Sequence, residues 1–370
     1  MGLQEILEQQ YDAGRVPGAV ALVARGSSEP EVAVVGARTV GGPPMTRDSL
    51  FRIASITKPL VAAATMVLVE QGVFALDDPV RRWLPELASP MVLRSAAGAV
   101  DDVVPATRPI TVRDLLTLRG GHGFTPDVGS PVAKLLIERL HQGRPQPRKW
   151  PAPDEWMRRL GEIPLLAQPG ERWTYNVGSD VLGVLLARAA GMSLGAVLSS
   201  TMLEPLGMSS TGFWASDVSR MTTLYERGAD GFVVTDSPDG QWVSPRPFES
   251  GAGGLVSTLD DWAAFGRMLL SGGGSVLSPS SVAQMMTSHV EDEPDNFFLD
   301  DQGWGFGGGV DVRLKEPWNV IGRYGWVGGT GTAGYVIPST GTVVVFLAQV
   351  ELTGPDDALA MGEVLTYGAS

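Results

Sequence analysis

The sequence has 370 residues, of which 44% are hydrophobic and 19% charged, a composition typical of a soluble globular protein and not of a disordered or fibrous one. Its 28 basic and 41 acidic residues give a formal net charge of −13, which argues against binding to nucleic acid. The absence of cysteine excludes disulfides and thiolate metal sites. The length predicts two lobes, because one domain usually holds roughly 100 to 200 residues.

The chain begins with a predicted helix over residues 4–13, followed by two strands, GAVALVARG and EVAVVGA, that predict a hairpin. The first 26 residues lack the basic, apolar and small-residue segments of a signal peptide. The longest apolar run, near residues 60–69, is shorter than the ~20 residues of a membrane span. We therefore expect a cytoplasmic protein that makes no membrane contact.

Ser55 and Lys58 lie at the start of a long apolar helix, in the segment FRIASITKPLVAAATMVLVEQG. One interpretation makes Ser55 a helix N-cap, with Pro59 tolerated in the first turn. The other makes the pair a nucleophilic centre, because residues three apart share a helix face and the helix N-terminus favours an anionic intermediate. A lysine can serve as the base when an apolar setting lowers its pKa. The S-x-x-K spacing alone leaves both interpretations open.

The middle of the chain predicts several helices separated by loops rich in proline and glycine. Near the C-terminus, GYVIP and GTVVVFLAQV flank a turn and predict a second hairpin, and GPDDALAMGEVLTYGA predicts a closing helix with an acidic first turn. Strands therefore lie at both ends of the chain. We expect a sheet domain from residues 1–76 and 250–370, and a mainly helical domain from residues 77–249.

Two further segments accompany the S-x-x-K box. Tyr175 precedes a helix in RWTYNVGSDVLG, and YGWVGGTGTAGYVIP forms a glycine-rich strand edge. Together with ITVRDLLTL and GAGGLVSTLDDWAAF, these segments cover nearly the whole chain, which resembles the serine beta-lactamase-like hydrolases: class C beta-lactamases, DD-peptidases and, nearest, family VIII carboxylesterases. The resemblance implies an α/β (α+β) two-lobed beta-lactamase/transpeptidase-like fold, with an antiparallel sheet from both termini flanked by helices and facing a mainly helical lobe.

The same resemblance implies the roles of the site residues. Ser55 is the acylated nucleophile, Lys58 its base partner and Tyr175 a second proton-transfer residue. The backbone N–H groups of Ser55 and Gly329 form the oxyanion hole. A glycine at position 329 would also let its strand approach the substrate closely, a physical reason independent of the family. Gly328, next to it, is assigned to substrate binding.

Two positions depart from the lactamase pattern. The lactamases carry an asparagine two residues after the tyrosine, where this chain has Val177, and Asn176 lies one residue too early. They also open the third box with a lysine, where this chain has Trp326. A lysine there pairs with the carboxylate of the substrate, whereas an indole offers an apolar wall and one donor. We expect Trp326 to line the cleft and the substrate to be a neutral ester; an ordinary interior position of the tryptophan is the alternative.

A second serine motif needs a different explanation. Residues 191–195 match G-x-S-x-G, the nucleophile-elbow pattern of alpha/beta-hydrolases. An elbow needs a strand before the serine, but VLGVLLARAA predicts a helix. We therefore predict Gly191 as a helix C-cap and Ser193 as the N-cap of the next helix.

The chain has 3 histidines, and His122, in the loop RGGHGF, is the one we expect to face a cleft. We assign His122 to substrate contact and not to a Ser-His-Asp triad. No cluster of His, Asp and Glu has the spacing of metal ligands, so we expect neither a metal nor another cofactor.

These observations predict a serine carboxylesterase that hydrolyses short- to medium-chain acyl esters through a covalent acyl-enzyme on Ser55, with a small-molecule ester as its partner. A beta-lactamase, an amide hydrolase or an acyltransferase of the same fold is the alternative, because different nucleophiles can discharge one acyl-enzyme. A catalytically silent binding module is the alternative from another class.

Overall fold

A computed structural model describes the protein at residues 1–95, 98–127, 129–143, 146–215, 217–290, 296, 298–299 and 302–370. Its largest sheet has seven strands. The strand order is β2-β1-β13-β12-β11-β10-β9, and every neighbouring pair is antiparallel. Two strands come from the start of the chain and five from its end, which confirms the predicted sheet from both termini. The strands are β1 (Gly18–Arg25), β2 (Glu31–Gly36), β9 (Gly303–Trp304), β10 (Gly309–Val310), β11 (Tyr324–Gly328), β12 (Thr332–Ile337) and β13 (Thr342–Ala348).

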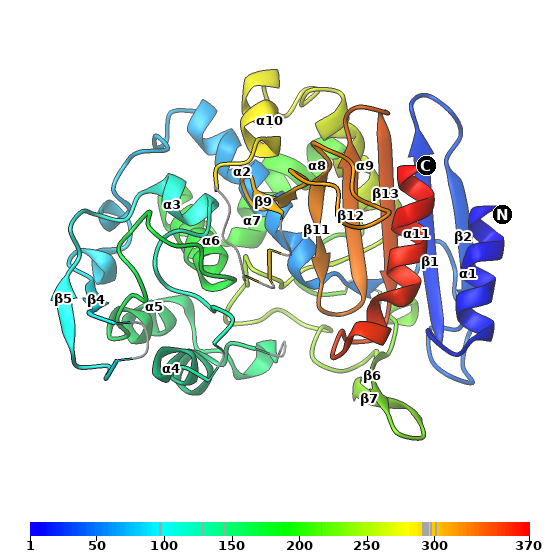
Figure 1. Ribbon diagram of the computed structural model, residues 1–370, viewed down its shortest axis with the longest axis horizontal. Coiled ribbons are helices and arrows are strands. Elements are labelled where there is room, and N and C mark those ends of the chain that lie inside the picture. The colour runs from blue at the N-terminus through cyan, green and yellow to red at the C-terminus, as the bar shows by residue number, and fades with distance from the viewer. Residues whose placement is uncertain are drawn as a thin grey trace.

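Helices cover both faces of this sheet. The first and last helices pack together on one face, at the right of Figure 1. Alternate residues of β1 point to opposite faces, so that Ala21 and Val23 contact this helix pair while Val20 and Leu22 join the larger core on the other face. The covering helices are α1 (Leu3–Asp12) and α11 (Leu359–Ala369) on the first face and α9 (Leu259–Leu270) on the second.

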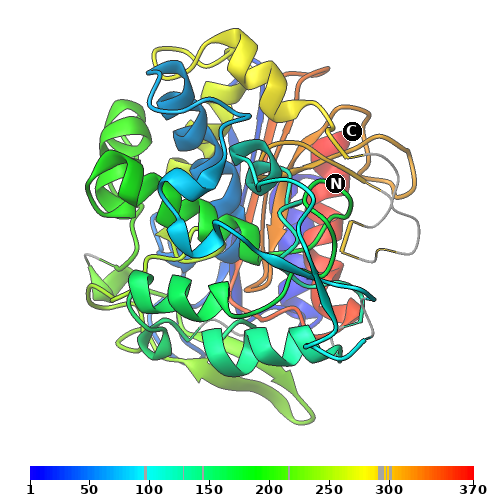
Figure 2. The same cartoon turned by 90° about the vertical axis from the view of Figure 1, so that its left-hand side faces the viewer.

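The predicted helical region lies beside the sheet, at the left of Figure 1 and toward the viewer in Figure 2. The helices expected there are confirmed, as α3 (Val112–Leu116), α4 (Pro131–Leu140), α5 (Pro153–Gly161) and α6 (Val177–Ala190). Four further helices of the described residues are α2 (Lys58–Glu70), α7 (Leu194–Leu198), α8 (Glu204–Leu206) and α10 (Pro279–Met286).

In the part of the chain that the structure describes, no single helix is long and apolar enough to span a membrane. One pair of helices bent by 79°, Val177–Ala190 with Leu194–Leu206, meets that test together on length and composition.

Three small two-stranded sheets complete the fold: β3 (Phe51–Arg52) with β8 (Val256–Ser257), β4 (Met91–Leu93) with β5 (Val103–Pro105), and β6 (Leu224–Gly228) with β7 (Gly231–Asp236). The sheet of β6 and β7 contacts the residues that directly follow β13. Tyr225 N–H donates to Gln349 O at 2.9 Å, and Glu351 N–H donates to Tyr225 O at 2.8 Å. Contacts therefore cross residue 249, and the division into domains at residues 76 and 249 stays a prediction.

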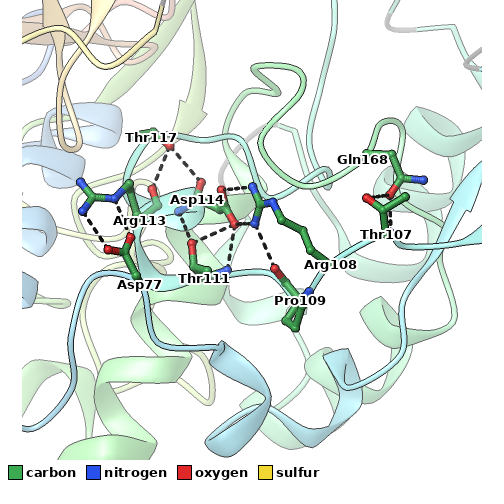
Figure 3. A network of polar contacts seen from close by, with 9 residues as sticks. All are labelled: Asp77, Thr107, Arg108, Pro109, Thr111, Arg113, Asp114, Thr117 and Gln168. Atoms are coloured by element: carbon green, nitrogen blue, oxygen red, sulfur yellow. Dashed lines mark hydrogen bonds and ion pairs between the residues drawn. The ribbon is translucent and has the colours of Figure 1, made fainter.

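A network of polar contacts fixes the start of α3 (Figure 3). Thr111 accepts a hydrogen bond from Asp114 N–H at 3.2 Å, and Asp114 accepts one from Thr111 N–H at 2.9 Å, which forms a capping box. Arg108 binds both oxygens of Asp114, at 2.6 and 2.9 Å. The loop after α3 is held to the segment before α6, because Leu118 O accepts from Thr174 N–H at 2.8 Å.

Candidate active site

Ser55 lies in a 3₁₀ turn, Ala54–Thr57, directly before α2. Thr57 precedes the first helical residue and no side chain caps this end of α2, so the interpretation of Ser55 as an N-cap is wrong. Side chains three apart are eclipsed in a 3₁₀ turn. Lys58 Nζ consequently stands 3.0 Å from Ser55 Oγ, within hydrogen-bond distance.

Lys58 is enclosed almost completely, with 1% of its surface exposed. Its Nζ lies 2.7 Å from Ala252 O and 2.9 Å from Asn176 Oδ1, which can only accept, and 3.4 Å from Tyr175 OH, in addition to Ser55. Burial lowers the pKa of Lys58, because a charged amine loses its hydration there. Interactions with Tyr175 and Asp180 raise the pKa of Lys58 and so oppose this shift only in part.

The acceptors around Lys58 have a chemical consequence. A neutral amine has two hydrogens and one lone pair, and the amide oxygens of Ala252 and Asn176 can only accept hydrogen bonds. When both hydrogens are given to these oxygens, the lone pair of Lys58 is left for the hydroxyl hydrogen of Ser55. The arrangement is therefore that of an amine base beside a serine nucleophile.

Tyr175 is held by aromatic rings and by two donors. Its ring stacks between Trp173, at 5.5 Å between centroids, and Phe298, at 5.0 Å, each with an interplanar angle of 24°. Its hydroxyl oxygen accepts from Trp326 Nε1 at 2.8 Å and lies 3.4 Å from Lys58 Nζ. Because the indole N–H can only donate, the hydrogen of the Tyr175 hydroxyl is left to act as a donor.

Trp326 lies on β11 with 5% of its surface exposed, and its ring meets Trp304 edge-on at 4.7 Å. It does not belong to the described residues that line the cavity beside Ser55. Its indole N–H serves Tyr175, which is the interior placement that the sequence left as the alternative. A direct contact of Trp326 with substrate stays a prediction.

A cavity of about 270 Å³ opens beside Ser55. Much of its lining is apolar, with Trp150, Trp242 and Leu352 among the larger side chains. Glu351, which is 7% exposed, places an acidic group in the same wall. The other lining residues are Ala54, Gly143, Pro147, Asn176, Ser250, Ala252, Gly253, Gly254, Gly329, Thr330 and Thr353.

The two glycines of the third box have different surroundings. Gly329 lines the cavity with Ser55, and a Cβ added to it would meet nothing within 4 Å. A Cβ added to Gly328 would lie 2.5 Å from Ile53 O and 2.2 Å from Thr332 Oγ1. At Gly328 the close contact is an approach of β11 to the turn before Ser55. The approach to substrate that we expect at Gly329 stays a prediction. The assignment of Gly328 to substrate binding stays a prediction, as does the oxyanion role of Gly329.

His122 is buried, with 4% of its surface exposed, and does not belong to the described cavity lining. Its Nε2 hydrogen-bonds to Ile163 O at 2.9 Å, and burial lowers the pKa of His122 to about 4. Two residues further on, Phe124 exchanges backbone hydrogen bonds of 2.8 and 2.9 Å with Tyr175. The His122 loop thus supports the backbone of Tyr175, and substrate contact by His122 stays a prediction.

The contact between Asn176 and Lys58 was not predicted from the sequence. Its φ of 80° and ψ of −65°, with a hydrogen bond of 3.1 Å from Val177 N–H to Tyr175 O, form a γ-turn of the rare, strained type. This turn directs the side chain of Asn176 to Lys58, although Asn176 lies one residue earlier in the sequence than the asparagine of the lactamases. The signal in the sequence was the residue type, because asparagine tolerates positive φ better than most residues.

Ser193 and Gly191 lie as the sequence predicted. Gly191 ends α6 in the left-handed conformation, with a φ of 67°, and Ser193 Oγ accepts from Ala196 N–H at 3.2 Å at the start of α7. The G-x-S-x-G motif is therefore a pair of helix caps. Across the residues that the structure describes, we find no group of three His, Asp or Glu side chains placed to hold a metal ion.

The fold is that of the serine beta-lactamase-like class. The chain belongs to the Beta-lactamase family, whose sequence model matches residues 3–366. It is 37% identical over 367 residues to an uncharacterized protein of Mycobacterium tuberculosis (strain CDC 1551 / Oshkosh), across 94% of this chain and 89% of that protein. It is 34% identical over 279 residues to esterase EstB of Burkholderia gladioli, across 70% of this chain and 67% of that protein.

A solved structure of EstCE1, described as a hydrolase with promiscuous acyltransferase activity, matches with a TM-score of 0.81 and 26% identity. The match covers 98% of this chain and 97% of that chain. The predicted fold and the resemblance to serine beta-lactamase-like hydrolases are confirmed. The comparisons support a serine hydrolase of this fold, acting as an esterase or an acyltransferase.

The two glycines give a first prediction. We expect Gly328→Ala to lower the free energy of unfolding by about 2 kcal/mol, because the new methyl group collides with backbone and forces the turn before Ser55 to move. Gly329→Ala is the matched control and should unfold at the wild-type denaturant concentration. Equal stability of the two variants in urea titrations would contradict the close contact.

A second prediction follows from His122. Its depressed pKa means that the unfolded chain takes up a proton that the folded protein excludes, so stability is present above about pH 6.5 and is lost as the pH falls toward 4. In urea titrations, the unfolding free energy of wild type relative to His122→Gln should fall by about 2 kcal/mol between about pH 7 and about pH 5. A difference that does not change with pH would mean that the ring is solvated.

Proposed function

We propose that the protein is a serine carboxylesterase that hydrolyses neutral, short- to medium-chain acyl esters through an acyl-enzyme on Ser55. The observation that carries this proposal is the hydrogen bonding of Lys58. Its amine is buried, its two amide acceptors can take both hydrogens of the neutral form, and the nearer of its two other contacts is the Ser55 hydroxyl, at 3.0 Å against 3.4 Å for Tyr175 OH. This is the state in which a lysine can remove the proton of a serine.

In the first half-reaction, Ser55 Oγ attacks the ester carbonyl carbon as its proton passes to Lys58 Nζ. The carbonyl oxygen becomes an oxyanion that accepts hydrogen bonds from the N–H groups of Ser55 and Gly329. Ser55 N–H suits this role because first-turn amides have no acceptor within their own helix. Tyr175 gives its proton to the leaving alcohol and recovers one from Lys58, which leaves the acyl-enzyme.

In the second half-reaction, water attacks the acyl carbon and transfers a proton to the same Lys58 and Tyr175 pair. Collapse of the tetrahedral intermediate returns a proton to Ser55 Oγ and releases the carboxylic acid. No redox step or external cofactor enters this balance. An alcohol in place of water would give transacylation, and the promiscuous acyltransferase activity described for EstCE1 makes an acyltransferase the second candidate function.

The preference for neutral esters is supported by the charges around the cavity. The family position that a lysine takes in lactamases is Trp326, so no cation stands there to pair with a substrate carboxylate. Glu351 adds an acidic group to the cavity wall. Both features disfavour an anionic substrate, and the apolar lining from Trp150, Trp242 and Leu352 favours an acyl or alcohol chain.

The nucleophile can be tested with two serine variants. Ser55→Ala should lower kcat for nitrophenyl butyrate by about 10⁴-fold or more, because no other hydroxyl replaces the nucleophile. Ser193→Ala, which removes only a helix cap, should keep near wild-type kcat and lose about 1 kcal/mol of stability. Retained hydrolysis in Ser55→Ala would reject the assignment of the nucleophile.

The charge preference can be tested with two esters of similar length, nitrophenyl butyrate and the anionic nitrophenyl hemisuccinate. Wild type should favour the neutral ester, and penicillin G should be a poor substrate. Glu351→Gln should raise kcat/KM for the hemisuccinate by about fivefold and leave that for butyrate nearly unchanged, since one repulsive charge is removed. Glu363→Gln, an exposed site on α11, is the control. A wild type that cleaves penicillin G as readily as the butyrate would favour the lactamase alternative.

A further inference from the structure

Lys58 begins and ends a closed ring of hydrogen bonds. From Lys58 Nζ the ring runs to Asn176 Oδ1 at 2.9 Å, and Asn176 Nδ2 donates to Gln142 Oε1 at 2.8 Å. Gln142 Nε2 donates to Asp180 Oδ2 at 2.9 Å. On the other side, Ala252 N–H donates to Asp180 Oδ1 at 3.0 Å, and Ala252 O accepts from Lys58 at 2.7 Å. Both amide oxygens that receive hydrogens from the lysine are thus tied to one carboxyl group.

The direction of every bond in this ring follows from the state of Asp180. An ionised carboxylate only accepts, so Gln142 must turn its NH₂ group toward Asp180 and its oxygen toward Asn176. Asn176 must then turn its NH₂ group toward Gln142, which leaves its oxygen for Lys58. A protonated Asp180 would permit the reverse order, in which the Asn176 NH₂ group faces Lys58 and occupies the lone pair that the base needs.

The hydrogen-bond donors around Asp180 suit an ionised carboxylate. The side chain is fully buried, and burial raises the pKa of Asp180. Three donors oppose that shift: Ser250 Oγ at 2.6 Å, Gln142 Nε2 and Ala252 N–H. The charged form of Lys58, when present, opposes it as well.

We propose that Asp180 is the positioning carboxylate of the site and that Gln142 transmits its effect. Asp180 holds Asn176 Oδ1 and Ala252 O toward Lys58 and thereby directs the free lone pair of the amine to Ser55. This inference rests on the proposed role of Lys58 as the base. Asp180 has no hydrogen bond to Ser55 and does not itself line the cavity, although it binds Ser250 and Ala252, which do. Its role is therefore to position other groups and not to react.

The main test is Asp180→Asn, which keeps the size of the side chain, removes its charge and lets the ring run in either direction. The rate of Ser55 labelling by a fluorophosphonate is measured as a function of pH in the full chain, beside steady-state ester hydrolysis. We expect the maximal labelling rate and kcat to fall by about tenfold or more, with KM changed by less than about twofold. The acid limb of the pH–rate profile, where the labelling rate falls as Lys58 becomes protonated, should move to lower pH. The reason is that losing a nearby negative charge destabilises the ammonium form of Lys58.

Asp261→Asn is the matched control for the loss of a buried carboxylate. Asp261 is 8% exposed, burial raises its pKa, and it accepts from Ser210 N–H at 2.9 Å and from Thr211 Oγ1 at 2.8 Å, outside the ring around Lys58. This variant should lose stability and keep the acid limb of the wild type. An Asp180→Asn protein whose acid limb also matches wild type would overturn the proposal.

Gln142→Leu tests the ring without removing a charge, and it decides the matter if Asp180→Asn does not fold. It should lower the labelling rate and kcat at nearly unchanged KM, with the acid limb close to that of wild type. The double variant should be no slower than the slower single one, because both break one ring. A wild-type labelling rate in Gln142→Leu would overturn the proposal. A wild type that labels at Ser55 but cleaves no ester would reject the proposed function and leave this test of Asp180 intact.

Discussion

The arrangement of the site depends on the burial of one amine, the Nζ atom of Lys58. An amine that is cut off from water must find its hydrogen-bond partners in the protein, and two of them come from far along the chain. Asn176 is 118 residues away and Ala252 is 194 residues away. The contacts of this one nitrogen therefore join the turn before α2, the start of α6 and the glycine-rich loop that precedes β8. A local change in any of these segments alters the surroundings of the amine.

The lactamases have a lysine at the position of Trp326, and this difference changes what determines the protonation state of Lys58. A second ammonium group near Tyr175 would repel a charge on Lys58 and so help to keep it neutral. The indole supplies a donor to Tyr175 without a charge, and burial is the largest cause of the lowered pKa of Lys58. The rings of Trp173 and Phe298, which enclose Tyr175, belong to the same low-polarity surroundings. Burial therefore lowers the pKa of Lys58 where a second cation would do so by repulsion.

The sequence predicted what depends on neighbours in the chain. The two hairpins, the first and last helices and the capping role of Ser193 follow from local patterns of apolar, turn and capping residues. Asn176 and Gln142 were not found, because their roles come from a strained turn and from contacts between distant segments. The need for a glycine at position 328 was not foreseen, because the collision that excludes a Cβ there involves Ile53, which only the folded chain brings near.

Two residues beside the lysine carry backbone strain, and the sheet holds one of them in place. Ala54, directly before Ser55, has a φ of 45°, and Asn176 has a φ of 80°. A residue with a side chain in this region is unfavourable unless its surroundings fix it. Thr332 Oγ1 donates to Ile53 O at 2.9 Å, so β12 is bonded to the residue before Ala54. Because the folded chain bears this strain before any substrate binds, Ser55 needs little rearrangement to meet Lys58, and the rigid sheet is the part of the fold that makes this possible.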